Sequence, residues 1–254
     1  MVRGPRSEVF TTMLVDAHGR VADWAAHWNR LQRHSRRLRI DLPEPEWEHL
    51  RPHAGPEGTL GRLSFIAEDG TWSWEQRQRG WFNEPVEAIT HPAPRWTPKV
   101  NGTKHGDWAP YRSAKAAAES AGCDVALLIH NHAIVDADRA TPMLLDEDGT
   151  VWLPSSDEGG VQGIVAEHLA ERLPSAGYPV QRGRLNERLV ARCRELVVVG
   201  TGLGVARVDA VDGEPMGSFN AFSAHLQTVL SEHYSQPATW ESMRPNDEQT
   251  VHGG

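Results

Sequence analysis

The chain has 254 residues, of which 39% are hydrophobic and 24% charged, close to the usual composition of a globular protein with one or two domains. Its 23 glycines and 17 prolines stay below the fraction typical of fibrous or disordered chains, so overall disorder is excluded. The net charge of −8 argues against general binding to nucleic acid or to an anionic membrane surface, and two cysteines, Cys123 and Cys193, are too few for a disulfide scaffold or a four-cysteine zinc site.

Residues 1–92 are predicted to form a small α+β unit. A β-rich run covers residues 8–15, and tryptophan and leucine residues at helical spacing predict a helix over 22–39. Residues 59–66 and 71–78 are predicted to form a hairpin, because a turn sequence separates them. Eight of the ten tryptophans lie before residue 109, so this unit is expected to be rich in aromatic side chains.

A stretch rich in proline, residues 91–103, lacks periodicity and is predicted to link this unit to a larger one over residues 93–234. The polar residues 235–254 are predicted to form a flexible tail. Within the larger unit the pattern predicts a helix over 109–121, strands over 125–129 and from 134, a hairpin centred on 146–149, a helix from 163, strands over 196–199 and 205–211, and a last helix over 218–232.

Two motifs suggest sites by themselves, and each has a plain structural alternative. The glycine-rich residues 200–204 follow an apolar strand, but a dinucleotide fingerprint requires a helix directly afterwards, and residues 205–211 alternate like a strand. A phosphate contact at this turn and a simple tight hairpin turn both remain open. His130 and His132 have metal-ligand spacing, but Asn131 between them is typical of a turn, so solvated histidines are favoured over a metal site.

Several segments, taken together and in order, resemble the class IV aminotransferases, which are fold-type-IV enzymes that use pyridoxal phosphate. The resemblance covers about residues 8–232. It rests on His27-Trp28-Asn29-Arg30-Leu31, similar to His-x-x-Arg-Leu; on Lys104, 20 residues before the strand that Asp124 opens; on residues 134–141, similar to Val-x-Glu-x-x-Arg-x-Asn; on Gly163-Ile164-Val165, similar to Gly-Ile-Thr; and on residues 195–201 with Gly204-Val205, similar to the family's strand and turn.

The resemblance implies a two-subdomain α+β fold, with a small N-terminal unit and a larger, β-barrel-like C-terminal unit with helices. It implies pyridoxal 5′-phosphate as the cofactor, held covalently by Lys104, which would also carry protons at the substrate α-carbon. Asp136, with Asp138 as the fallback, would stand beside the pyridine nitrogen, and Gly202 would lie on the substrate side. The residues implied for the phosphate are Arg30, Thr201 and the helix start at Gly163, Ile164 and Val165.

The family further implies small-molecule substrates, a homodimer and a pocket partly covered by the tryptophan-rich first unit, with no nucleic acid or membrane partner. The residues around the first methionine lack the apolar centre of a signal peptide, and no segment reaches the roughly 18 apolar residues of a membrane-spanning helix, so a soluble cytoplasmic protein is expected.

The main functional hypothesis is an aminotransferase that moves an amino group between an amino acid and a 2-oxo acid. The alternatives are a β-elimination lyase similar to aminodeoxychorismate lyase, and a degenerate cofactor-binding relative without turnover. The last alternative follows from three departures: Asp136 replaces the family's glutamate, Thr141 an asparagine and Val165 a threonine. The strand pattern predicts that Asp136 points inward and Arg139 outward, and it cannot separate Asp136 from Asp138.

Overall fold

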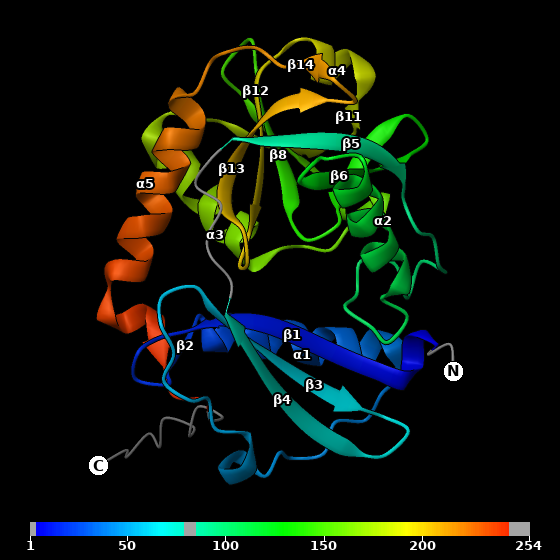
Figure 1. The fold of residues 1–254 in the computed structure, drawn as a ribbon, viewed down its shortest axis with the longest axis vertical. Helices are drawn as coiled ribbons and strands as arrows, with labels where there is room; N and C mark the ends of the chain where they lie inside the picture. Colours follow the sequence, from blue (N-terminus) through cyan, green and yellow to red (C-terminus); the bar gives the residue numbers. More distant parts are fainter. Residues whose placement is uncertain (1–3, 79–84, 244–254) are drawn as a thin grey trace, which may run out of the picture.

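The computed structural model describes residues 4–78 and 85–243. Its first sheet has five antiparallel strands in the order β15-β2-β1-β3-β4, covered on one face by helix α1 (Trp24–Leu38) (Figure 1). The strands are β1 (Glu8–Val15), β2 (Val21–Ala22), β3 (Thr59–Ile66), β4 (Thr71–Gln78) and β15 (Trp240–Glu241).

Side-chain alternation gives the first sheet one face for the core and one for a cavity. Helix α1 buries Trp24, Leu31 and Leu38, which recur at helical spacing and pack with Val9 and Met13 of β1. Successive residues of a strand point to opposite faces. Phe10 and Thr12, the alternate positions of β1, therefore point away from α1, toward the second sheet.

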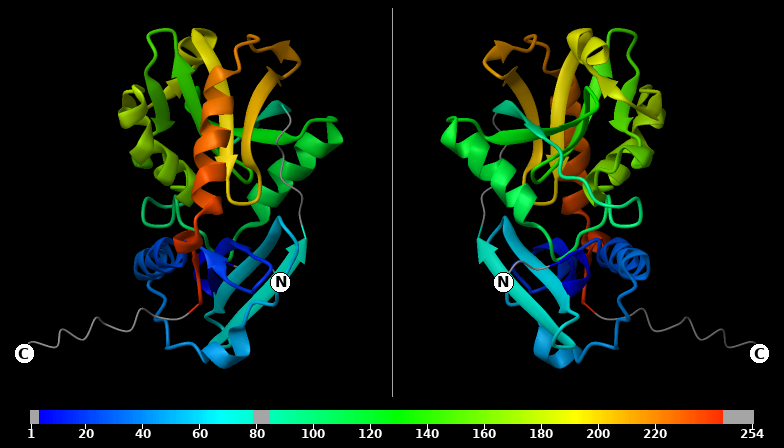
Figure 2. Two further views of the ribbon diagram at one scale, coloured as in Figure 1. Left: turned by 90° about the vertical axis from the view of Figure 1, so that its left-hand side faces the viewer. Right: turned by 90° about the vertical axis from the view of Figure 1, so that its right-hand side faces the viewer.

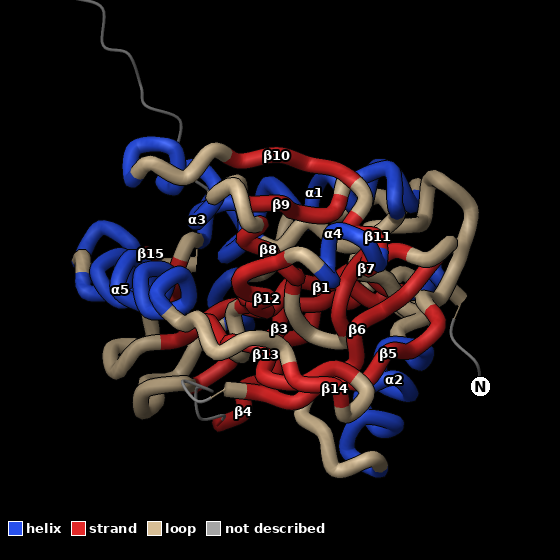
Figure 3. The backbone as a smooth tube through the Cα atoms, turned by 90° about the horizontal axis from the view of Figure 1, so that it is seen from above, coloured by secondary structure: helices blue, strands red, loops and turns tan. Residues whose placement is uncertain are grey.

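The second sheet is larger, with the strand order β10-β9-β8-β12-β13-β5-β6-β7-β11, and β14 pairs with β13. It curls on itself, as the view from above shows (Figure 3), so that its two halves enclose an interior. Its strands are β5 (Val86–Pro92), β6 (Val125–His130), β7 (Ala133–Ala137), β8 (Thr141–Asp146), β9 (Val151–Pro154), β10 (Val180–Gly183), β11 (Leu185–Asn186), β12 (Cys193–Gly200), β13 (Gly204–Val211) and β14 (Glu214–Pro215). The helices of this part of the chain are α2 (Ala109–Ser120), α3 (Ile164–Arg172), α4 (Glu187–Ala191) and α5 (Ala221–Ser235).

The apolar strands of this sheet are buried on both faces. Leu196 and Val198 of β12 point into the interior of the curl, where they pack with Leu144. Val197 and Val199, on the opposite face, pack under α3 and α5. Helix α2 covers a further part of the outer face through a separate apolar cluster (Figure 2). This arrangement explains why the strands read as continuous apolar runs in the sequence.

Most predicted elements are present, and two assignments along the chain are corrected. The predicted helices correspond to α1, α2, α3 and α5, and the two predicted hairpins are β3–β4 and β8–β9. Residues 86–92, which the sequence prediction placed in the first unit, form β5 between β13 and β6 of the second sheet. The predicted tail is also ordered in part, because β15 pairs with β2; the remainder of the tail, residues 244–254, lies outside the described residues.

The α+β class and the β-barrel-like second unit agree with the sequence prediction. Within the described ranges, no helix has the length and apolarity needed to cross a membrane.

Candidate active site

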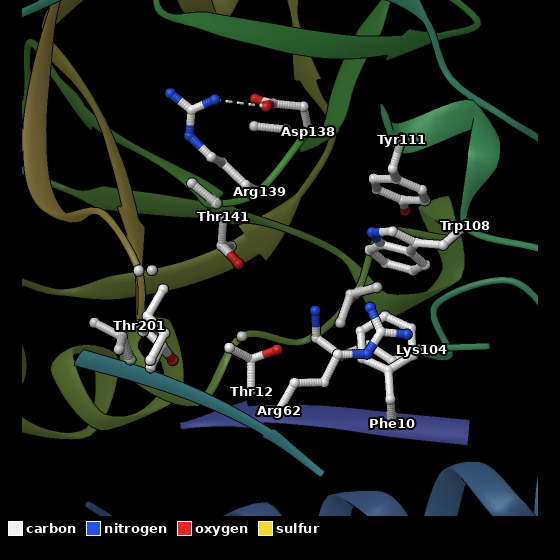
Figure 4. A pocket seen from close by; sticks show the side chains of 18 of the residues that line it. Phe10, Thr12, Arg62, Lys104, Trp108, Tyr111, Asp138, Arg139, Thr141 and Thr201 are labelled. Carbon is white, nitrogen blue, oxygen red and sulfur yellow. Dashed lines mark hydrogen bonds and ion pairs between the residues drawn. The ribbon is translucent and has the colours of Figure 1, made fainter. Parts of the chain in front are cut away.

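A cavity of about 540 Å³ lies between the two sheets, a size typical of small-molecule sites (Figure 4). The first unit contributes the outward-facing Phe10 and Thr12 of β1, and the second contributes loops at the ends of its strands. The cavity brings together every residue that the sequence analysis named for a cofactor site: Arg30, Lys104, Asp136, Gly163, Ile164, Val165, Thr201 and Gly202.

Arg30 is a buried cation at one end of this cavity. It lies on the same face of α1 as His27, one turn earlier, and it is only 3% exposed. One terminal nitrogen, Nη2, donates to Thr11 Oγ1 at 2.8 Å, and the other, Nη1, donates to the carbonyl of Gln162 at 3.4 Å. In the part of the chain that the structure describes, its Nε has no hydrogen-bond partner, and burial lowers the pKa of Arg30 to about 9. Arg30 is therefore a desolvated charge held by neutral groups.

His27 is neutral and supports Arg30 through Thr11. Since Thr11 Oγ1 accepts from Arg30, its own hydrogen is left to donate to His27 Nδ1, which lies 2.8 Å away. Burial, and then the nearby cations Arg30 and Lys104, lower the pKa of His27 well below its usual value. This contact gives the histidine of the His-x-x-Arg-Leu motif a physical role, which is to orient the arginine.

The start of α3 adjoins Arg30. Gln162, the residue that accepts from Arg30, is followed by Gly163, the N-cap of α3, and the first N–H groups of that helix have no acceptor within the helix. A side chain at Gly163 would come within 2.5 Å of Thr141 Oγ1, so the close packing here requires glycine. Thr201, in the tight turn between β12 and β13, lines the same cavity. An arginine, a helix dipole and a hydroxyl therefore share one cavity, a combination suited to an anion.

Lys104 lies beside the two aromatic rings of Phe10 and Trp108, with Nζ 5.2 Å and 4.8 Å from their centroids. Its backbone is fixed, because its N–H donates to His34 Nδ1 at 3.0 Å. Burial and then the charge of Arg30 lower the pKa of Lys104 to about 7, although Asp136 acts in the opposite direction. The amine is thus neutral in about half of the molecules near pH 7.

The other two lysines of the sequence have different surroundings. Lys99 is exposed, and Lys115, near the outer end of the cavity, pairs with Glu119 one turn further along α2. Lys104 is therefore the lysine whose amine is both sheltered and depressed in pKa.

Asp136 is 4% exposed and accepts three hydrogen bonds. Tyr111 Oη and the N–H of Val161 donate to Oδ2 at 3.0 Å and 2.9 Å, and the N–H of Ala137 donates to Oδ1 at 3.0 Å. Burial nevertheless raises the pKa of Asp136 to about 7, against the effect of these donors and of Lys104. The carboxylate is preorganised for a cationic partner that would restore its charge.

The structure separates the two aspartates that the sequence pattern left equivalent. Asp138 lies beyond the end of β7, where its carboxylate accepts from Arg139 at 3.0 Å and from the N–H of Ala126 at 3.2 Å. Its oxygens are thus committed to structural partners. The outward orientation predicted for Arg139 is wrong: strand alternation ends at Ala137, and Arg139 lines the cavity while pairing with Asp138 (Figure 4).

Five further side chains that line the cavity were not predicted from the sequence: Phe10, Thr12, Arg62, Trp108 and Tyr111. Phe10 and Thr12 were detectable as the alternate positions of β1, but Tyr111 was not, because only folding brings it against Asp136. The expectation that the tryptophan-rich first unit partly covers the cavity agrees with the structure, because Phe10, Thr12 and Arg62 of that unit line it. Trp24 and Trp28 of this unit stack together on the α1 side of the sheet.

The family follows from the sequence match. A profile described as "Amino-transferase class IV" matches residues 65–211, more than half of the chain. The chain belongs to the class IV aminotransferases. The predicted family, enzyme class and fold class are therefore confirmed. A search of curated proteins finds no match to this class IV aminotransferase.

Solved structures share its fold over most of their length. A protein described as a 4-amino-4-deoxychorismate lyase is 28% identical, with 86% of this chain and 88% of that chain covered and a TM-score of 0.69. A second such protein, from Legionella pneumophila, is 16% identical, with 89% and 91% covered and a TM-score of 0.75. A branched-chain amino acid aminotransferase from T.th., in complex with N-(5′-phosphopyridoxyl)-L-glutamate, is 17% identical, with 94% and 90% covered and a TM-score of 0.78.

Proposed function

We propose that this class IV aminotransferase binds pyridoxal 5′-phosphate in the cavity between its two sheets. The residues present fit that group. Arg30 is a buried cation with an unpartnered Nε, and no ion pair of Arg30 occurs within residues 4–78 and 85–243. A phosphate beside Arg30 and the start of α3 would supply the missing negative charge.

Lys104 and Asp136 fit the two other polar positions of the cofactor. When bound, the cofactor's ring withdraws electrons from the substrate α-carbon. Lys104 would bind it covalently through Nζ and, when released, would take a proton from the α-carbon and return it, a task suited to an amine with a pKa near 7. Asp136 would keep the ring nitrogen protonated through its charge, and Phe10 and Trp108 would exclude water from Nζ.

The reaction that we propose is transfer of an amino group between an amino acid and a 2-oxo acid. The observation that carries the proposal is the juxtaposition of a sheltered lysine amine with a buried carboxylate on one side and the Arg30 anion site on the other. In a single-turnover experiment, an amino acid should convert the bound cofactor to its amine form, with loss of absorbance near the aldehyde band and release of a 2-oxo acid.

A β-elimination lyase is the second candidate, and the 28% identity to a protein described as a 4-amino-4-deoxychorismate lyase favours it. Elimination would release pyruvate and leave the cofactor in its aldehyde form, so the same experiment separates the two reactions. A protein that binds the cofactor and does neither would be a relative without turnover. Cofactor absorbance before and after a panel of L- and D-amino acids distinguishes the three.

The resemblance to the family also supports a homodimer, and the cytoplasmic location expected from the sequence stays a prediction. Light scattering should then give a particle of about twice the 28.2 kDa chain. A mass equal to one chain would contradict the proposed dimer without affecting the proposed chemistry.

A further inference from the structure

Tyr111 stands out among the cavity residues because it belongs to none of the motifs that indicate the family. It lies in the first turn of α2 and is 5% exposed. Its ring stacks on Trp108, with centroids 4.0 Å apart and an angle of 2° between the planes. It is also nearly parallel to the ring of Trp96, at a centroid distance of 6.3 Å. The ring is therefore held in one orientation, and its hydroxyl group donates to Asp136 Oδ2 at 3.0 Å.

The hydrogen bonds of Asp136 are unequally divided between its two oxygens. Oδ2 accepts from both Tyr111 and the N–H of Val161, whereas within residues 4–78 and 85–243 the N–H of Ala137 is the one donor to Oδ1. A carboxylate oxygen has about two lone-pair sites. Oδ2 is thus fully engaged by the protein, and Oδ1 keeps the capacity to accept a donor in the cavity that Asp136 lines.

The Val161 donor is itself held close by its neighbour Gly160. A side chain at Gly160 would overlap the carbonyl oxygen of Val135, so the segment can approach Asp136 only with glycine at this position. Tyr111 approaches Asp136 from α2, a different element. Two independent segments therefore converge on one oxygen, which is the arrangement expected when the orientation of a carboxylate matters.

We propose that Tyr111 is a positioning residue, which engages Asp136 Oδ2 and thereby presents Oδ1 to a protonated ring nitrogen of the cofactor. The proposal rests on the proposed function. Its chemical reason is that an aspartate reaches one methylene less far than the glutamate found in relatives, so its placement depends more on support from the protein. The Tyr111 hydroxyl also favours the charged form of Asp136, which burial otherwise disfavours.

The test uses apoprotein and compares the binding of pyridoxal 5′-phosphate with that of its 1-deaza analogue, in which carbon replaces the ring nitrogen. Only pyridoxal 5′-phosphate can pair with Asp136 through its ring nitrogen. The dissociation constant of the analogue divided by that of pyridoxal 5′-phosphate therefore measures that pairing, and a larger ratio means a stronger pairing. Tyr111→Phe is expected to reduce the ratio about fivefold, as expected for loss of one buried hydrogen bond. The matched control is Tyr178→Phe, which should leave the ratio unchanged. Tyr178 is a half-buried tyrosine that packs against Phe222 of α5.

A second readout needs no cofactor. In apoprotein labelled with ¹³C at aspartate carboxyl groups, the pKa of Asp136 should rise in Tyr111→Phe, because a donor to its charged form is lost. If Tyr111→Phe does not fold, 3,5-difluorotyrosine at position 111 keeps the packing and strengthens the O–H donor, and the ratio should then increase about twofold.

The outcomes separate this inference from the proposed function. An unchanged ratio in Tyr111→Phe, or in the difluorotyrosine protein, or an unchanged carboxyl titration of Asp136, overturns the role of Tyr111 while cofactor binding stands. Failure of the unmodified protein to bind either compound overturns the proposed function itself.

Discussion

Replacing Arg30 with methionine should stabilise the apoprotein and weaken cofactor binding, two effects of opposite sign. Arg30 is 3% exposed, and among the described residues its hydrogen-bond partners are the neutral groups of Thr11 and Gln162 and, at the long distance of 3.5 Å, the neutral His27 Nδ1. Its charge therefore costs free energy in the apoprotein, because desolvation is not offset by a carboxylate. A bound phosphate would remove that cost, so the same residue that destabilises the apoprotein should stabilise the complex.

The depressed pKa of Arg30 gives the size of the effect. A pKa lowered from 12.5 to about 9 corresponds to roughly 5 kcal/mol against the charged form in the folded state. Since the folded-state pKa lies below the unfolded value, this penalty is fully present below pH 9 and declines as the pH rises toward 12.5. The gain from removing this charge is opposed by the loss of the hydrogen bonds to Thr11 and Gln162, of about 1 kcal/mol each, and of some packing. The expected net gain is about 1–2 kcal/mol, or an increase of roughly 3–6 °C in Tm.

Thermal unfolding at pH 7.5 of apoprotein and cofactor-loaded protein measures both effects. Arg30→Met should unfold at higher temperature than the parent as apoprotein, and its affinity for the cofactor should fall about 10- to 100-fold, the range for charge-assisted hydrogen bonds. Arg36→Met, an exposed position on the same helix, is the control and should change neither quantity appreciably. An Arg30→Met apoprotein less stable than the parent, or one that binds the cofactor equally well, would refute the reasoning.

Four further predictions concern Lys104, the two aspartates and Gly160. An amine-selective reagent should modify Lys104 of the apoprotein ahead of Lys99, because only the neutral amine reacts. The rate at Lys104 should rise with pH and be half-maximal near pH 7. Peptide mapping that finds Lys99 modified first would contradict the depressed pKa of Lys104. Borohydride reduction of cofactor-loaded protein should likewise attach the cofactor at Lys104, and attachment at another lysine would be against the assignment. Asp136→Ala should lose most of the exchange of the substrate α-proton, measured by ¹H NMR. Asp138→Ala should keep this exchange but lose about 1–3 kcal/mol of unfolding free energy in urea, because the buried carboxylate of Asp138 pairs with Arg139. Equal exchange in both variants would remove Asp136 from the mechanism. Gly160→Ala should lower the unfolding free energy by about 1–3 kcal/mol, because the added methyl group would overlap the carbonyl oxygen of Val135. It should also weaken cofactor binding, since it displaces the segment that donates to Asp136. Unaltered stability would show that the backbone around Gly160 can shift without cost.

Local patterns in the sequence determined most of the secondary structure of this protein. The turn sequence between residues 59–66 and 71–78 predicts a hairpin, and β3 and β4 have the predicted bounds. The spacing of Trp24, Leu31 and Leu38 similarly predicts α1, since only one stripe of that helix is buried.

The order of the motifs along the chain determined the family and the cavity residues. Arg30, Lys104 and Asp136 lie in three separate segments, and their shared cavity was predicted only through the resemblance to the class IV aminotransferases. Neither composition nor periodicity contains that information, because an isolated lysine or arginine has the same local signal on a surface as in a site.

The tertiary structure decided which strands pair and which side chains support the site. Residues 86–92 read as the end of the first unit, yet β5 lies between β13 and β6, because both partners leave open hydrogen-bonding edges that only a distant strand can satisfy. The residues of β15 have no local apolar pattern and are ordered by pairing with β2, more than 200 residues earlier in the chain. The contact of Tyr111 with Asp136 arises in the same way, since it depends on the start of α2 packing against the end of β7 rather than on a repeat within the sequence.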